Sequence, residues 1–264
     1  MRRVEPKYRR PLNTEQVIIL ELLYKFRFII IAIVKDYFAE SNPGMNVFKR
    51  LERLEEQGFI AKRYFDNYQL LHKPVVYYLL PAGARKLGEY RDKDDTSNIN
   101  IKAIYKDATV SEQFAMHCVA VLGLYNILTA EYGDDIDFLA KSDQTDIENL
   151  PKQKSDAYVM LETDQSVQHY FIDVLDDDAH LLIDASKQIK RYINYKKSGD
   201  WALVAESPFP TILFVCNSEE ASKRVQKRCE AILHKAWVLD IKFSATTRSE
   251  IILNCNSHLH ANGS

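Results

Sequence analysis

The sequence predicts a two-part protein of mixed α and β structure, with a small N-terminal module of helices and a hairpin followed by a larger α/β domain. Three observations predict it. From residue 46 to residue 90 the patterns run helix, hairpin, helix, and basic residues are concentrated in the same third of the chain. Residues 109–245 then give the order α, β, β, β, α, β, α, β, which is typical of helices packed on a mixed central sheet.

Two helices are expected before the hairpin. Asn13 and Thr14 can cap a helix that carries the apolar residues 17–23, because a side-chain oxygen at this position accepts a hydrogen bond from a free amide at the helix start. The apolar run 29–38 predicts a second helix, since charged residues polarise one side and a Ser-Asn-Pro-Gly turn follows. A strand is the alternative for so short an apolar run.

A basic amphipathic helix is predicted from Met45 onward. Phe48, Leu51 and Leu54 recur at three-residue spacing as its apolar side, and Gly58 stands where a helix C-terminus favours glycine. The other sides carry amide and cationic groups, which are suited to base edges and phosphates in a DNA groove. These DNA-binding candidates are Asn46, Lys49, Arg50 and Arg53.

A hairpin and a short helix follow the basic helix. Residues 59–65 and 74–80 are rich in aromatic and β-branched residues and predict two strands, joined by a polar tip around Asp66 and Asn67. With a helix start at Pro81, this order predicts a winged helix-turn-helix domain over residues 10–92, a module that usually places one helix in a DNA groove. The alternative is a generic helical module with a solvated basic surface. The hairpin adds three phosphate-binding candidates, which are Lys62, Arg63 and Lys73.

Charge is distributed unevenly along the chain. The 264 residues have a formal net charge of −2, but residues 1–90 hold 16 Lys and Arg against 10 Asp and Glu, and the remainder holds 19 against 27. A basic N-terminal module attracts phosphate backbones, whereas the acidic remainder repels them on balance. The charge pattern therefore favours nucleic-acid binding by the N-terminal module.

Several classes of protein find no support in the sequence. The cysteines, at positions 118, 216, 229 and 255, share no short spacing, so they indicate reduced thiols rather than a zinc knuckle or a disulfide framework. The apolar run 26–34 is shorter than the roughly 20 residues that span a bilayer, and no signal-peptide core follows the basic N-terminus. The expectation is a cytoplasmic protein without membrane contact.

The second domain is expected to follow a polar linker over residues 93–108. It covers residues 109–245, begins with a long helix from Thr109 or Ser111 to Tyr132, and leaves a polar C-terminal tail over residues 246–264. The later expected elements are strands 136–140, 157–161 and 170–175, helix 184–197, strand 212–216, helix 219–235 and strand 238–243.

Two aspartates lie on strands that are expected to be neighbours in the sheet. Asp156 precedes the strand 157–161 and Asp173 lies near the end of the next, and the order of elements resembles the core of the PD-(D/E)XK nuclease superfamily. The resemblance implies metal-binding acids at Asp156 and Asp173, with Glu112 of the preceding helix as a third acid. Such carboxylates can hold Mg²⁺ or Mn²⁺, which orients an attacking water and stabilises the leaving oxygen of a phosphodiester.

One part of the nuclease pattern is missing. The superfamily places a lysine two residues after the second acid, but Leu175 stands there. Lys187 and Lys190 of the following helix are candidates for a migrated lysine, and the alternative is that both simply line a basic helix. A catalytically silent or non-nuclease domain is therefore favoured over an active endonuclease, and an unrelated α/β domain is the remaining alternative. The run 191–197 mixes tyrosines with cations, which suits nucleic-acid backbone contacts, with packing on the sheet as the alternative.

The chain as a whole resembles the replication-relaxation proteins of bacterial plasmids and mobile elements. The resemblance spans about residues 10–245 and rests on the order of the elements: a winged helix, a polar linker, a long helix containing His117, the strand start at Asp156, an acid-ending strand and a Lys-rich helix that ends in Tyr. Ser155 stands where the family pattern has proline.

The resemblance implies a double-stranded DNA-binding accessory protein in plasmid or mobile-element replication, relaxation or transfer. It implies no cofactor for DNA binding, whereas Mg²⁺ or Mn²⁺ is expected only if the nuclease-like site is functional. Double-stranded DNA, a second copy of the chain and plasmid replication or transfer proteins are the expected partners. The alternatives are a metal-dependent endonuclease and a winged-helix transcription regulator.

Overall fold

The computed structural model describes residues 11–91, 104–164, 166–176, 179–238, 240–251 and 253. Most of the predicted linker, up to residue 103, and most of the predicted tail, from residue 254, lie outside this range. The chain forms two compact units, residues 1–126 and 127–264, and the division falls within helix α6 (Glu112–Tyr132). The domain boundary near residue 100 stays a prediction.

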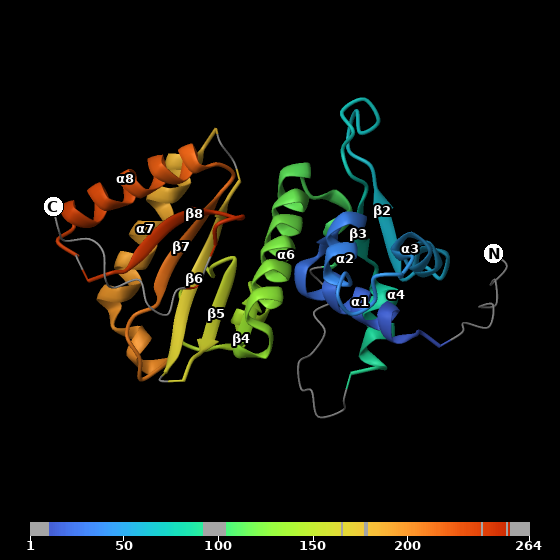
Figure 1. The fold of residues 1–264 in the computed structure, drawn as a ribbon, viewed down its shortest axis with the longest axis horizontal. Coiled ribbons are helices and arrows are strands. Elements are labelled where there is room, and N and C mark those ends of the chain that lie inside the picture. The colour runs from blue at the N-terminus through green and yellow to red at the C-terminus, as the bar shows by residue number, and fades with distance from the viewer. Residues whose placement is uncertain are drawn as a thin grey trace. The chain divides into compact units, whose positions relative to one another are not determined.

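The described part of the N-terminal unit combines helices with a small sheet (Figure 1). Three short antiparallel strands make this sheet in the order β1-β3-β2. Its elements, before α6, are α1 (Thr14–Phe26), β1 (Phe28–Ile29), α2 (Ile31–Tyr37), α3 (Val47–Glu56), β2 (Ile60–Arg63), β3 (Val76–Leu79) and α4 (Pro81–Gly88).

The start of α1 forms as the sequence predicts. Asn13 is the N-cap, and its side-chain oxygen accepts a hydrogen bond from the backbone N–H of Gln16 at 3.0 Å, while the Gln16 side chain accepts one from the backbone N–H of Asn13 at 3.2 Å. The helix predicted over 29–38 is only partly right, because Ile29 pairs with Tyr77 in the sheet and α2 begins at Ile31. The apolar run is thus divided between a strand and a helix.

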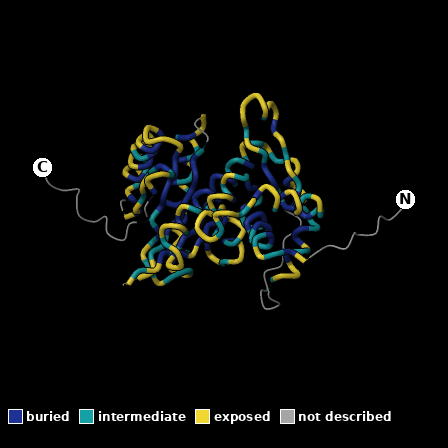
Figure 2. The backbone as a smooth tube through the Cα atoms, turned by 45° about the vertical axis from the view of Figure 1, so that its right-hand side comes forward, coloured by how far each residue is buried: buried dark blue, intermediate teal, exposed yellow. Residues whose placement is uncertain are grey.

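The hairpin strands are shorter than predicted, and residues 64–75 form a long loop between them. Figure 2 shows this loop as a largely exposed projection. The α4 start at Pro81 is confirmed. A Cβ atom on Gly83 would lie 2.2 Å from the carbonyl oxygen of Phe59, so only glycine lets α4 pack this closely on the chain that leaves α3.

The C-terminal unit is built on a five-stranded mixed sheet in the order β4-β5-β6-β7-β8. The pairs β4·β5 and β5·β6 are antiparallel, whereas β6·β7 and β7·β8 are parallel. Helices α7 and α8 pack on the same face of the sheet (Figure 1). The elements are β4 (Ile136–Ala140), β5 (Ala157–Glu162), β6 (Val167–Leu175), α7 (Leu181–Ser198), β7 (Thr211–Cys216), α8 (Glu219–Lys235) and β8 (Phe243–Thr247).

The core of this unit lies between the sheet and the two helices. Phe171 and Phe214 of the sheet are fully buried against Ile189 of α7 and Val225 of α8. Burying side chains of this size stabilises a fold by roughly 1.5–3 kcal/mol each. The mixed α and β class and the mixed central sheet are therefore confirmed.

The last strand is the clearest error of the sequence prediction. Residues 238–243 were expected to form it, but β8 begins at Phe243, where it pairs in parallel with Ile212. Val238 and Ile241 are buried in the core from the loop before the strand. Their apolar character reflects burial rather than strand structure.

Helix α6 has one property that the sequence prediction overlooked. The segment Glu112–Asp135 is long and apolar enough to cross a membrane by length and composition, and no other helix in the described residues passes this test. The core helix of a soluble protein passes the same test, so this is weak evidence for a membrane span.

Candidate functional site

Helix α3 carries four of the predicted DNA-binding residues. Asn46 caps its N-terminus, since its side-chain oxygen accepts a hydrogen bond from the backbone N–H of Lys49 at 3.0 Å. Val47, Leu51 and Leu54 are at most 1% exposed and hold the helix against the rest of the unit. Because these three residues follow the helical spacing, they share one side of α3 and leave the opposite side to solvent.

Phe48 corrects the predicted apolar side of α3. It was expected in the buried stripe, but its side chain is 53% exposed. Val47 takes the buried position instead, and the next residue is rotated by about 100° around the helix. Lys49, Glu52 and Arg53 are exposed as well. The outer side of α3 therefore presents an aromatic ring together with cations.

The cations of α3 differ in whether they form ion pairs within the protein. In the described part of the chain, Lys49 and Arg53 make no ion pair. Arg50 lies with its guanidinium nitrogen 3.9 Å from a carboxylate oxygen of Glu15. Surface pairs of this kind contribute little, so they do not prevent a phosphate from taking the place of the carboxylate.

The cations at the base of the hairpin, Lys62 and Arg63, also make contacts within the protein. Lys62 donates to Glu55 at 3.0 Å, and this hydrogen bond raises the pKa of the exposed Lys62 amine. Arg63 donates to the carbonyl oxygen of Val110 at 2.5 Å and lies over the ring of Phe65, 4.9 Å from its centroid. Arg63 thus has a structural role within the unit, which the sequence prediction did not foresee.

Lys73 and Glu112 were assigned to two different sites, but they contact each other. The Lys73 amine lies 2.8 Å from a carboxylate oxygen of Glu112, the first residue of α6. Both belong to the N-terminal unit, whereas Asp156 and Asp173 belong to the C-terminal unit. The third candidate acid therefore has a cation partner of its own.

The loop of the hairpin is more apolar than predicted. Asp66 and Asn67 are exposed, as expected for a polar tip. However, Leu70 and Leu71 are 78% and 57% exposed, and the ring of Tyr64 packs on a neighbouring tyrosine. The loop thus exposes both polar and apolar groups.

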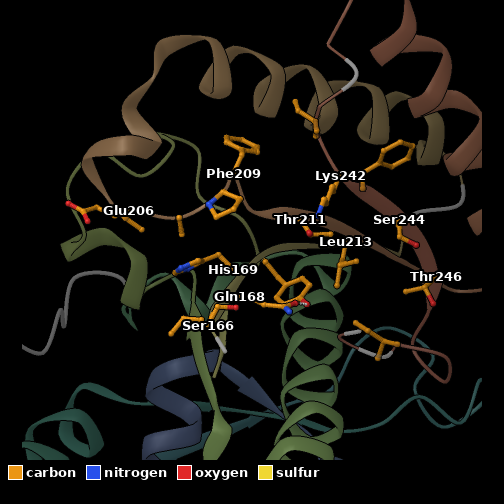
Figure 3. Close-up of a pocket in the computed structure, with 18 of the residues that line it drawn as sticks. Ser166, Gln168, His169, Glu206, Phe209, Thr211, Leu213, Lys242, Ser244 and Thr246 are labelled. Carbon is orange, nitrogen blue, oxygen red and sulfur yellow. Dashed lines mark hydrogen bonds between the residues drawn. The ribbon is translucent and has the colours of Figure 1, made fainter. Parts of the chain in front are cut away.

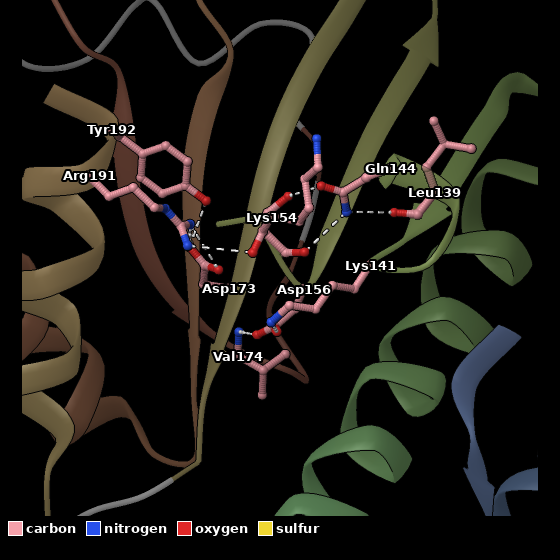
Figure 4. A network of polar contacts seen from close by, with 10 residues as sticks. Leu139, Lys141, Gln144, Lys154, Asp156, Asp173, Val174, Arg191 and Tyr192 are labelled. Atoms are coloured by element: carbon pink, nitrogen blue, oxygen red, sulfur yellow. Dashed lines mark hydrogen bonds and ion pairs between the residues drawn. The ribbon is translucent and has the colours of Figure 1, made fainter. Parts of the chain in front are cut away.

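Asp173 is the centre of a buried polar network in the C-terminal unit, drawn in Figure 4. Its carboxylate accepts hydrogen bonds from Arg191 of α7 at 2.9 and 3.3 Å and from the hydroxyl of Tyr192 at 2.7 Å. The side chains of Asp173 and Arg191 are only 3% and 12% exposed. Burial raises the pKa of the Asp173 carboxyl, and the Arg191 guanidinium opposes this shift. Sequence reasoning missed Arg191 as the partner of Asp173.

Asp156 lies beside this network on the neighbouring strand. One of its carboxylate oxygens accepts a hydrogen bond from the backbone N–H of Val174 at 2.9 Å, and the other lies 3.8 Å from the amine of Lys141 (Figure 4). Its negative charge contributes to the raised pKa of Asp173. The structure therefore brings the two predicted acids together and surrounds them with N–H donors.

A second set of hydrogen bonds holds the chain before β5. Ser155, the residue before Asp156, is 1% exposed and donates to the side-chain oxygen of Gln144 at 3.0 Å. The Gln144 amide donates in turn to the carbonyl oxygens of Leu139 and Ser155, at 3.2 and 3.1 Å. These hydrogen bonds hold the chain between β4 and β5 at the start of β5.

The lysine candidates lie elsewhere on α7. Lys187 and Lys190 are exposed, and together with Arg228 of α8 they line a hollow of about 400 Å³. Lys187 pairs with Asp184 at 3.3 Å. Among the described residues, no group of three or more His, Cys, Asp or Glu side chains could hold a metal ion.

A larger cavity of about 1050 Å³ lies along β6, β7 and β8 and holds none of the predicted site residues (Figure 3). His169 lines it, with a ring nitrogen 2.7 Å from the hydroxyl of Tyr158. Burial lowers the pKa of His169, so the neutral ring is favoured. Phe209 and Glu206 contribute an aromatic and an acidic group from the loop before β7.

The family model for replication-relaxation proteins matches residues 20–202 of the chain, which is more than half of its length. The chain belongs to the replication-relaxation family. The matched range includes α3, the hairpin and the two acids Asp156 and Asp173, so it covers a part of each unit and ends before β7. The family expected from the sequence is thereby confirmed.

Two comparisons with solved structures give distant similarities. The restriction endonuclease FokI is 12% identical, with a TM-score of 0.32, and the match covers 90% of this chain and 42% of that one. FokI bound to DNA is 11% identical, with a TM-score of 0.27, and coverages of 90% and 43%. The chain spans less than half the length of these structures, and likenesses this weak support no conclusion. A search of curated proteins found no match.

Proposed function

We propose that this chain is a double-stranded DNA-binding accessory protein in the replication, relaxation or transfer of a plasmid or mobile element. Membership of the replication-relaxation family supports a role in replication. In this proposal the N-terminal unit acts as a winged helix-turn-helix, with α3 as the recognition helix and the loop 64–75 as the wing, and the protein works in the cytoplasm. Dimer formation and partner proteins stay predictions.

The outer side of α3 carries the proposal. Its buried side is fixed by Val47 and Leu51, so the orientation of the helix is determined by packing. Lys49 and Arg53 are exposed and make no ion pair among the described residues, which leaves their charges available to phosphates or guanine edges. Phe48 supplies an apolar contact of the kind that recognises the methyl group of thymine.

Binding to a labelled duplex, measured over a range of salt concentrations, tests this surface. The double variant Lys49→Ala, Arg53→Ala is expected to bind about tenfold more weakly, and the slope of log K against log[salt] is expected to fall by about two if both contact phosphates. The matched control is Arg85→Ala, Lys106→Ala, which removes the same charge from exposed positions outside α3. Equal slopes for the two double variants would contradict the assignment.

We further infer that the Asp156 and Asp173 pair serves the structure of the C-terminal unit and is catalytically silent. The guanidinium of Arg191 already supplies the cation that Asp173 needs. The polar atom left without a partner there is the Nε of Arg191, which is a donor, whereas a metal ion needs acceptors. The donor set therefore does not fit a divalent cation.

Supercoiled plasmid is the substrate for testing this inference. The purified protein is expected to leave the plasmid intact with Mn²⁺ or Mg²⁺ at every protein concentration tested. Metal-dependent nicking that Asp173→Asn abolishes would instead establish the endonuclease alternative, with the two aspartates as its metal ligands. Nicking that survives this substitution would show that Asp173 is not a ligand of the metal that supports it, and the inference about the pair would stand.

A further inference from the structure

The net acidity of the C-terminal unit conceals a basic layer. Helices α7 and α8 together hold ten Lys and Arg against four Asp and Glu, whereas the rest of residues 127–264 holds five against 18. In the net charge of the whole unit, the positive charge of the two helices is outweighed by the negative charge of the remaining residues. One layer of this unit is therefore attractive to anions although the unit as a whole is not.

Packing turns most of these cations outward. The buried sides of α7 and α8 are apolar and include Ile189 and Val225. Tyr192 and Tyr195 are 0% and 6% exposed, so the tyrosines of the run 191–197 belong to the core. Because these rings are buried, they cannot stack on nucleic-acid bases. The exposed Lys and Arg side chains of α7 and α8 are the groups that can contact a ligand.

A hollow of about 400 Å³ between α7 and α8 gathers three of the cations, Lys187, Lys190 and Arg228. Arg228 donates from its Nε to the hydroxyl of Ser186 at 2.8 Å, and Ser186 donates to the carbonyl oxygen of Leu182. This chain of hydrogen bonds orients the Arg228 guanidinium and leaves its two terminal nitrogens for a ligand.

Few acidic groups compete at this hollow. In the described part of the chain, Lys190 and Arg228 make no ion pair. Lys187 has the neighbouring Asp184 at 3.3 Å, but both side chains are solvent-exposed, so the pair is weak. An oriented guanidinium flanked by two ammonium groups matches the geometry and charge of a phosphate oxygen pair.

We propose that this hollow, lined by Lys187, Lys190 and Arg228, binds the phosphodiester backbone of DNA and gives the protein a second DNA contact besides α3. The inference rests on the proposed function in that the ligand is DNA. It requires no base recognition, because the lining consists of three cations, the hydroxyl of Ser186 and the apolar side chains of Leu182 and Ile183, and includes no aromatic ring. The contact therefore adds affinity that is independent of sequence and sensitive to salt.

The test compares four forms of the full chain on one duplex: wild type, the hollow variant Lys187→Ala, Lys190→Ala, Arg228→Ala, the α3 variant Lys49→Ala, Arg53→Ala, and their combination. The control is Lys152→Ala, Lys235→Ala, Lys242→Ala, which removes three exposed charges of the same unit outside the hollow. The slope of log K against log[salt] is expected to fall by two to three in the hollow variant, at about 0.9 per phosphate contact.

The outcomes separate the two assignments. A hollow variant with the same salt slope as the control variant overturns the second contact, whatever the α3 variant does. If the hollow variant loses affinity and the α3 variant does not, the second contact stands and the assignment of α3 fails. If poly-glutamate is retained by the wild type but not by the hollow variant, with unchanged DNA slopes, the hollow takes an acidic protein and the proposal is wrong.

Discussion

On the outer side of α3, Lys49 and Arg53 lie in solvent without a carboxylate partner among the described residues, whereas Arg191 of α7 is enclosed with Asp173 and donates to it twice. Because Lys49 and Arg53 form no ion pair among the described residues, their charges remain available to a ligand. Arg191 is committed, because withdrawing it would leave a buried carboxylate unpaired. The proposed binding surface and the buried Asp173–Arg191 ion pair therefore use charge in opposite ways, and each can be tested by removing the charge.

The largest effect is expected where the buried pair is broken. Arg191→Met removes the charge at similar volume and leaves Asp173 buried without its cation, so the free energy of unfolding should fall by about 3–5 kcal/mol in urea denaturation. Lys187→Met, at an exposed position of the same helix, should change it by no more than about 0.5 kcal/mol. Similar losses for the two variants would mean that Asp173 does not depend on the charge of Arg191.

The orientation of α3 can be tested by a pair of truncations. Leu51→Ala should cost about 2–5 kcal/mol of unfolding free energy, because Leu51 is fully buried. Phe48→Ala should stay within about 0.5 kcal/mol in stability yet weaken DNA binding. Thermal unfolding and duplex titration of both proteins measure this. A destabilised Phe48→Ala protein would mean that Phe48 packs in the core, as the sequence pattern first indicated.

The cap of α3 should have a smaller effect. Asn46→Ala removes the hydrogen bond to the backbone N–H of Lys49, which should lower the free energy of unfolding by about 1 kcal/mol. Asn194→Ala is the matched control, since Asn194 is an exposed residue within α7, where alanine is the better helix former. A loss at Asn194 equal to that at Asn46 would show that the cap has no special role.

The smallest effect concerns pH. Burial lowers the pKa of His169 below its usual 6.5, so the folded state binds fewer protons than the unfolded state on acidification. Stability should therefore fall as the pH drops through 6.5 towards the lower folded pKa, and His169→Gln should flatten this part of the profile. Urea midpoints between pH 5 and pH 8 measure the slope, and an equal slope in the variant would exclude His169 as its source.

The sequence predicts local structure well where periodicity and caps agree. Helix α8 and strand β4 match their predicted bounds, and the Asn13 cap forms as expected. The predictions fail where burial comes from elsewhere in the chain. Val238 lies in the core without belonging to a strand, and the position of β8 depends on its pairing with β7, which no local pattern encodes.

The candidate sites show the same limit more sharply. Sequence spacing brings Asp156 and Asp173 together correctly, because neighbouring strands fix their register. The partner of Asp173 could not be found in this way, since Arg191 meets it only when α7 docks on the sheet. The error at Phe48 has another cause. Val47 and Phe48 both fit the helical spacing with Leu51 and Leu54, and the prediction placed Phe48 in the buried stripe, although Val47 is the buried residue.

The sheet of the C-terminal unit also has a kinetic consequence. Strands β4, β5 and β6 pair with their sequence neighbours, so their loops close over short distances, whereas β7 pairs with β6 only after the chain has crossed through α7. Short loop closures are fast and the crossover is slower. Asp156 and Asp173 should thus come together early in folding, when Asp173 is still hydrated. The docking of α7, which brings Arg191 to Asp173, should be a later step.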